Sequence, residues 1–149
     1  MSNVATLRPP SSDEFAIDLN ELVPDSTWEL SYLGHETRLM FGSAGKLVLR
    51  FKIIDPGEHF EKEVCRYYNV ELIGKPGNKG RFKPGRNSNF VRDYVTLFGR
   101  PRRGDRISLR QLCGHIVIGR TRTVKTNSKG KSLGEAAYSV VDELIGFKD

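Results

Sequence analysis

The chain has 149 residues, 38% of them hydrophobic and 28% charged, which suits one folded domain with short terminal segments. No uncharged apolar stretch approaches the length of a bilayer span, and the first residues lack the apolar centre of a secretory signal. Two cysteines, Cys65 and Cys113, lie far apart in the sequence, which excludes a disulfide scaffold and a four-cysteine zinc site. We therefore expect a cytoplasmic protein without a membrane-spanning helix.

Basic residues are concentrated in one segment. Between Gly74 and Lys131, 16 Lys and Arg residues are opposed only by Asp93 and Asp105, a net charge of +14, whereas the rest of the chain carries −8. A strongly positive surface attracts phosphate backbones, although it can also serve only to keep a protein soluble. The scarcity of acids within the segment favours nucleic acid, and the lack of a long basic amphipathic helix argues against a membrane surface.

The N-terminal part predicts a tail followed by a folded domain. Residues 1–12 end in Pro-Pro-Ser-Ser and indicate a flexible tail, and residues 13–23 mix apolar and acidic residues, which predicts an apolar edge segment. Pro24 and Asp25 then favour a turn. We therefore divide the chain into residues 1–23, the tail and edge segment, and residues 24–149, the folded domain.

Three strands are expected next. Apolar residues alternate with polar ones from Trp28 to Tyr32, and Gly34 favours a bulge or bend, after which the strand is expected to resume at residues 37–41. A loop at 42–45 leads to the clearest strand of the chain, Lys46–Asp55, in which Leu and Phe alternate with Lys and Arg.

Residues 63–73, dense in Val and Tyr, predict the third strand. Its more apolar face, with Val64, Arg66 and Tyr68, is expected to point inward, although a guanidinium does not fit an apolar face. The Gly-, Pro- and Lys-rich residues 75–85 then predict a polar loop outside the core, with Phe82 as its one aromatic residue.

A helix is predicted from Asn87 or Ser88, as N-cap, to Phe98, with Gly99 as its stop. Its apolar residues recur on one face, which predicts that this face is buried.

The remaining residues predict a short helical turn and two strands. Ser108 is expected to cap a turn that runs through Leu112. Residues 115–125 predict a fourth strand and residues 126–134 a polar hairpin. Residues 138–145 predict a fifth strand, with a terminal helix as the alternative.

Three strands, a helix and two strands is the order of an OB fold, a small barrel with one helix between strands 3 and 4. A bend at Gly34 would let the first strand serve both sides of such a barrel. We therefore expect a mainly β chain that forms an OB-fold-like five-stranded barrel, with an unspecific α+β sandwich as the alternative.

Catalytic signatures are weak in this sequence. The three histidines occur singly, without the spacing of zinc ligands. Four acids, Asp55, Glu61, Glu63 and Glu71, lack the pattern of a metal-dependent nuclease. We therefore expect no enzymatic activity, no cofactor and no metal site.

A protein that binds single strands needs a cationic groove along the backbone and aromatic faces on which unstacked bases rest. Strand alternation predicts that Arg50 and Lys52 point outward, and that one of Tyr67 and Tyr68 does so too. Phe82 is the best stacking candidate because its loop is too polar for a core. The predicted nucleic-acid-binding residues are Arg50, Lys52, Tyr67, Tyr68, Lys79, Arg81, Phe82, Lys83, Arg86, Arg120, Arg122, Lys125, Lys129 and Lys131.

Several segments resemble phage and mobile-element proteins related to single-stranded DNA-binding proteins. They are Trp28-Glu29-Leu30, the strand from Lys46 to Ile53, Asp55-Pro56-Gly57, Arg66-Tyr67-Tyr68-Asn69-Val70, the stretch from His115 to Thr121, and Tyr138-Ser139-Val140-Val141. The resemblance covers about residues 28–145. It implies an OB-like fold and a role in replication, recombination or transfer of a phage or mobile element.

The sequence thus predicts a non-enzymatic protein that binds single-stranded DNA without regard to sequence, with RNA as an alternative ligand. We expect no membrane partner, and a homodimer is left open. Two other functions stay in view: a basic accessory or inhibitor protein that docks on an acidic protein partner, and a small metal-dependent nuclease.

Overall fold

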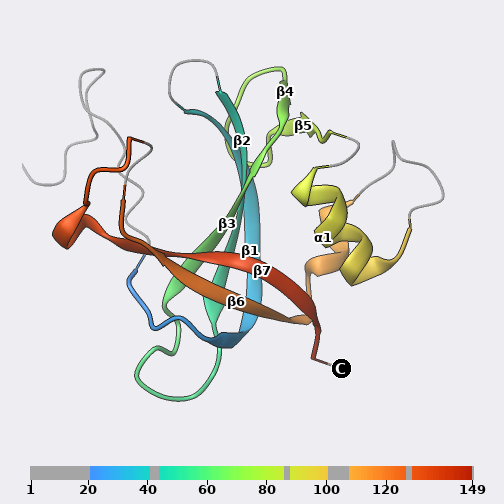
Figure 1. The fold of residues 1–149 in the computed structure, drawn as a ribbon. Coiled ribbons are helices and arrows are strands. Elements are labelled where there is room, and N and C mark those ends of the chain that lie inside the picture. Colours follow the sequence, from blue (N-terminus) through green and yellow to red (C-terminus); the bar gives the residue numbers. More distant parts are fainter. Residues whose placement is uncertain (1–20, 41–43, 86–87, 101–107, 127–128, 149) are drawn as a thin grey trace, which may run out of the picture.

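A computed structural model describes residues 21–40, 44–85, 88–100, 108–126 and 129–148. The described chain is mainly β, with a five-stranded antiparallel sheet, a separate two-stranded hairpin and one α-helix (Figure 1). The strands are β1 (Thr27–Met40), β2 (Ala44–Ile53), β3 (Glu63–Asn69), β4 (Glu71–Ile73), β5 (Arg81–Lys83), β6 (Ile116–Val124) and β7 (Tyr138–Phe147). The helix is α1 (Asn89–Phe98), and 3₁₀ turns occur at η2 (Leu109–Leu112) and η3 (Gly134–Ala136). The predicted tail, residues 1–12, and the predicted edge segment up to residue 20 lie outside the described residues.

The sheet has the strand order β3-β2-β1-β6-β7. The long strand β1 pairs with β6 through its first residues, 27–31, and with β2 from Leu30 onward. The register shifts between Tyr32 and Gly34, and Gly34 has a φ of 146°, so the predicted bulge is confirmed. Figure 1 shows β6 and β7 crossing the β1–β2–β3 part at a steep angle, which makes β1 the strand common to both parts.

The predicted closed barrel is not observed, because the sheet stays open between β3 and β7. No ladder joins these two strands within the described residues. Because every neighbouring pair in the sheet is antiparallel, β3 and β7 have the same sense in the strand order. The Arg66 side chain spans this opening, and its Nη1 donates to the Val141 carbonyl at 3.4 Å, where a closed sheet would have backbone hydrogen bonds.

The predicted third strand, 63–73, is divided after Asn69, because the chain leaves β2 there and forms a hairpin with β5. The Val70 N–H donates to the Gly45 carbonyl at 3.2 Å. A Cβ at Gly45 would lie 2.5 Å from the Val70 carbonyl oxygen, so this crossing requires glycine. The expectation of a loop throughout 75–85 is therefore wrong for residues 81–83, which form β5.

The hairpin formed by β4 and β5 is fastened to β1. The Thr37 N–H donates to the Gly77 carbonyl at 2.9 Å, and the Lys79 N–H donates to the His35 carbonyl at 3.0 Å. These bonds use a stretch of β1 that β6 does not reach, since β6 pairs only with residues 27–31. The connection between β4 and β5 therefore lies along the edge of β1.

The core lies between the sheet and α1. Leu47, Leu49, Phe51 and Ile53 of β2 are at most 2% exposed, as the alternation predicts, but Val48, on the opposite side of the strand, is buried as well. Val23 also joins this core, and its N–H donates to Ser139 Oγ on β7 at 2.8 Å.

The helical predictions are confirmed. Ser88 is the N-cap of α1 and accepts from the Val91 N–H, and Gly99 is its C-cap. Ser108 caps η2 in the same way through the Arg110 N–H. Residues 138–147 form a strand, so the alternative of a terminal helix is wrong. None of the helices in the described ranges has the length and apolar character needed to cross a membrane.

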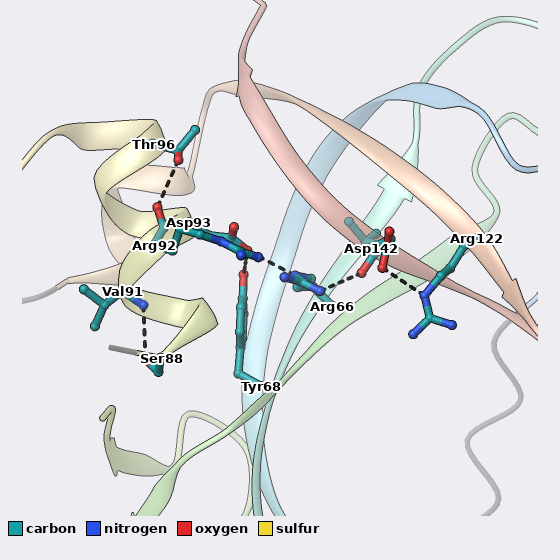
Figure 2. Close-up of polar contacts among 10 residues, drawn as sticks. Arg66, Tyr68, Ser88, Val91, Arg92, Asp93, Thr96, Arg122 and Asp142 are labelled. Atoms are coloured by element: carbon teal, nitrogen blue, oxygen red, sulfur yellow. Dashed lines mark hydrogen bonds and ion pairs between the residues drawn. The ribbon is translucent and has the colours of Figure 1, made fainter. Parts of the chain in front are cut away.

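A buried polar cluster joins α1 to β3 and β7 (Figure 2). Asp93 Oδ2 accepts from Tyr68 Oη at 2.6 Å and from Arg66 Nε at 3.1 Å, and the Arg66 guanidinium carbon lies 4.8 Å from the centroid of the Tyr68 ring. The Arg66 and Asp93 side chains are 9% and 5% exposed. Arg66 can point inward from β3 because Asp93 on α1 supplies a carboxylate that neutralises its charge.

Removing one member of this cluster should be costly. Asp93→Ala leaves the buried Arg66 guanidinium without its counter-charge, and we expect the free energy of unfolding to fall by about 3–5 kcal/mol, measured by urea denaturation. The double variant Arg66→Met, Asp93→Leu removes both charges, so we expect it to lose less stability than Asp93→Ala does. A loss below about 1 kcal/mol for Asp93→Ala would contradict a buried, unrelieved charge.

Candidate nucleic-acid interface

The side of the β1–β2–β3 sheet that faces away from the core carries a group of cations around one tyrosine. Strand register puts Arg38, Lys46 and Asn69 in one row across the sheet, and Glu36, Val48 and Tyr67 in the next. Arg50 lies opposite Cys65 in the third row, and Lys52 lies opposite Glu63 in the fourth. We call this surface the outer face and define its polar and aromatic members as Glu36, Arg38, Lys46, Arg50, Lys52, Glu63 and Tyr67.

Tyr67 is the tyrosine that points to the outer face, and Tyr68 points to the core. Tyr67 is half-buried, whereas Tyr68 is only 3% exposed and its ring packs edge-on against Phe90 at 5.3 Å between centroids. The prediction that Tyr68 contacts nucleic acid is therefore wrong, because both the ring and the hydroxyl are committed to the interior. Burial, together with the charge of Asp93, raises the pKa of Tyr68 well above its usual value.

Two of the outer-face arginines are paired with carboxylates on the same face. Arg50 Nη2 lies 2.8 Å from Glu63 Oε1, and this hydrogen bond raises the pKa of Arg50. Arg38 donates twice to Glu36, from Nε at 3.0 Å and from Nη2 at 2.8 Å. Lys46 Nζ donates to Asn69 Oδ1. Four cations and two carboxylates give the outer face a net charge of +2.

The hairpin of β4 and β5 forms a second basic region. Lys79, Arg81 and Lys83 are exposed on it, as predicted, and Lys75 is exposed beside them. Phe82 differs from its prediction: it lies in β5, is half-buried, and packs edge-on against Phe90 at 5.4 Å between centroids. The hairpin alternates, so Phe82 faces the core while its neighbours face solvent.

That arrangement corrects the choice of Phe82 as the best stacking residue. Its ring also packs edge-on against His35, at 6.0 Å between centroids. A ring that is already enclosed by other rings has less surface to offer to a base. Arg86, another predicted contact, lies outside the described residues.

The third basic region is on β6 and the connection to β7. Arg120 and Arg122 point outward, as predicted, but both are paired with acids of β7: Arg120 Nη2 lies 3.0 Å from Glu143 Oε1, and Arg122 Nε lies 2.9 Å from Asp142 Oδ1. Lys125, Lys129 and Lys131 are exposed on the connection. These ion pairs could not be predicted from neighbouring residues, because the acids belong to a strand 20 residues or more further along the chain.

The predicted residues therefore do not form one groove. Figure 1 shows the hairpin of β4 and β5 and the connection between β6 and β7 at well-separated places. The cations of the basic segment are thus distributed over several elements. The outer face instead gathers Arg50 and Lys52 with two cations that the prediction missed, Arg38 and Lys46. Arg38 and Lys46 are paired by the antiparallel register of β1 and β2, which places both side chains on the same face.

The acids considered for metal-dependent chemistry have other partners or lie apart. Asp55 Oδ1 accepts from the Glu29 N–H at 2.6 Å, Glu63 pairs with Arg50, and Glu71 lies opposite Lys83 in the hairpin. In the part of the chain that the structure describes, no three His, Cys, Asp or Glu residues gather in a way that could hold a metal ion.

Comparisons with known proteins add no assignment: no protein-family model, no curated protein and no solved structure matches this chain.

The buried Tyr68 hydroxyl predicts a loss of stability at high pH. Its pKa is raised in the folded chain, so the folded state keeps a proton that the unfolded state releases near pH 10. The contribution of Tyr68 to the free energy of unfolding is therefore fully present below about pH 10, and it decreases as the pH rises above that value. In Tyr68→Phe, we expect the slope of unfolding free energy against pH to be shallower by up to about 1.4 kcal/mol per pH unit. Urea denaturation from pH 8 to 11.5 measures both slopes, and equal slopes would refute the assignment.

Proposed function

We propose that this chain binds single-stranded nucleic acid through the outer face, without regard to sequence. The observation that carries the proposal is the position of Tyr67, which shares that face with Lys46, Arg50 and Lys52. Cations in neighbouring rows of one sheet can contact a phosphate backbone, and a tyrosine among them can stack with an unstacked base. The outer face carries both kinds of side chain on three paired strands.

The fold that we propose is an OB-like barrel left open between β3 and β7. Three features support it: the strand order β3-β2-β1-β6-β7, the helix between β3 and β6, and the bulged β1 shared by both parts of the sheet. OB folds bind oligonucleotides on the face of their second and third strands. Here those strands are β2 and β3, which carry most of the outer face.

The ligand that we propose is single-stranded DNA, with RNA as the alternative, and the activity is binding and not cleavage. A role in replication, recombination or transfer of a phage or mobile element follows from the resemblance of the strand segments described above. The proposed cytoplasmic location rests instead on the two widely separated cysteines, which suit a reducing compartment. The cations and the tyrosine of the outer face support binding of a nucleic-acid strand. They recognise phosphates and base rings in general, which supports binding without regard to sequence.

Titration with an oligo-dT strand tests the function directly. We expect tighter binding to oligo-dT than to a matched duplex, with log K falling by about 0.7 per phosphate neutralised for each unit of log[salt]. Fluorescence or anisotropy at two salt concentrations measures affinity, slope and site size. Equal binding of both ligands, or none, would remove the single-strand function and leave a duplex or an acidic protein as the partner.

Tyr67→Ala tests the outer face as the location. Loss of a stacking platform should weaken oligo-dT binding by about 1–3 kcal/mol, while Tyr67→Phe, which keeps the ring, should bind nearly as well as the parent chain. Tyr138→Ala is the matched control, because Tyr138 is a half-buried tyrosine at the start of β7, away from the outer face. Weakening by Tyr138→Ala and not by Tyr67→Ala would move the interface to β6 and β7.

A further inference from the structure

Glu63 occupies a central place among the cations of the outer face. It lies directly opposite Lys52 in the register of β2 and β3, and its Oε1 lies 2.8 Å from Nη2 of the diagonal neighbour Arg50. Its backbone N–H donates to Glu21 Oε2 at 3.0 Å, so its position does not depend on its own carboxylate. One carboxylate therefore lies beside two of the four cations that would contact a strand.

Building on the proposed function, we propose that Glu63 is an internal competitor for phosphate, and that Glu36 plays the same part for Arg38. Each carboxylate occupies guanidinium N–H groups that a phosphate would use. A bound strand must displace it or accept its repulsion. The two acids thus set the affinity of the outer face below what its four cations would otherwise give.

The geometry of the ion pairs supports exchange. Glu36 binds Arg38 through two parallel hydrogen bonds, the same fork with which arginine binds a phosphate. The Arg50 and Glu63 side chains are 40% and 38% exposed, so neither charge is sealed from solvent. Exposed ion pairs of this kind contribute little to stability, and a phosphate can therefore replace the carboxylate at small cost.

The carboxylates also hold the cations in place before a ligand arrives. The hydrogen bond to Glu63 on β3 restrains the Arg50 side chain, so less side-chain freedom remains to be lost on binding. Competition and positioning act in opposite directions on affinity. We expect competition to prevail, because neutralising Glu63 raises the net charge of the outer face from +2 to +3 while Lys52 and Arg50 keep their places on the strand.

Glu63→Gln is the test, with oligo-dT as the probe at low and high salt. We expect binding about two- to five-fold tighter than the parent chain at low salt, and a smaller gain at high salt. Glu143→Gln is the matched control: it frees Arg120 from an ion pair of similar exposure and changes the net charge by the same amount, but it lies on β7. We expect it to change the affinity little.

A double-mutant cycle separates a local effect from a general one. If Glu63 acts on the outer-face cations, the gain from Glu63→Gln should shrink in an Arg50→Ala background. Equal gains from Glu63→Gln and Glu143→Gln, or no gain from Glu63→Gln, would overturn the inference while the proposed function stands. Absence of oligo-dT binding by the parent chain would instead overturn the proposed function itself. Thermal unfolding of each variant verifies that the fold is retained.

Discussion

The hydrogen-bonded cluster of Asp93, Arg66 and Tyr68 is the interaction on which the rest of the structure depends. It lies where the sheet is open, and it connects three elements that share no backbone ladder: α1, β3 and β7. Two opposite charges so far from solvent are tolerated only because each has a partner. Arg66 makes two interactions: it neutralises Asp93 on the helix, and it donates a hydrogen bond to the Val141 carbonyl on β7. The helix is thereby held against the opening between β3 and β7.

The same cluster determines which residues reach the outer face. Successive side chains on β3 point to opposite sides, so an inward Arg66 and an inward Tyr68 oblige Tyr67 to point outward. Its cross-strand neighbours on β2 and β1 are then fixed by register. The interior polar cluster and the candidate interface are therefore two sides of one strand. A shift of one residue in the register of β3 would bury Tyr67 and expose Arg66. Asp93 would then be buried without its partner.

The sequence was most informative where local chemistry decides the structure. The caps of α1 and η2, the alternation of β2 and the bulge at Gly34 depend on neighbouring residues and were predictable. Predictions failed where a distant partner decides. Phe82 looked like a loop residue because its neighbours are polar, yet Phe90 and His35 enclose it. Arg120 and Arg122 point outward as predicted, but their ion pairs with acids of β7 could not be foreseen from neighbouring residues. Arg38 and Lys46 became candidates only when register placed them together.

β1 pairs with both β2 and β6, and this affects the order in which the chain folds. Its later residues pair with β2, the next strand, but Thr27 pairs with Arg120, which lies most of the chain away. Contacts between β1, β2 and β3 are local and need little loop closure, whereas the pairing with β6 must wait until a long intervening segment has been ordered. We therefore expect a three-stranded meander to form early and to keep Leu30 uncovered until the C-terminal third of the chain arrives. Slow, non-local completion of this kind leaves an unpaired strand edge exposed during synthesis, when the chain is most prone to aggregate.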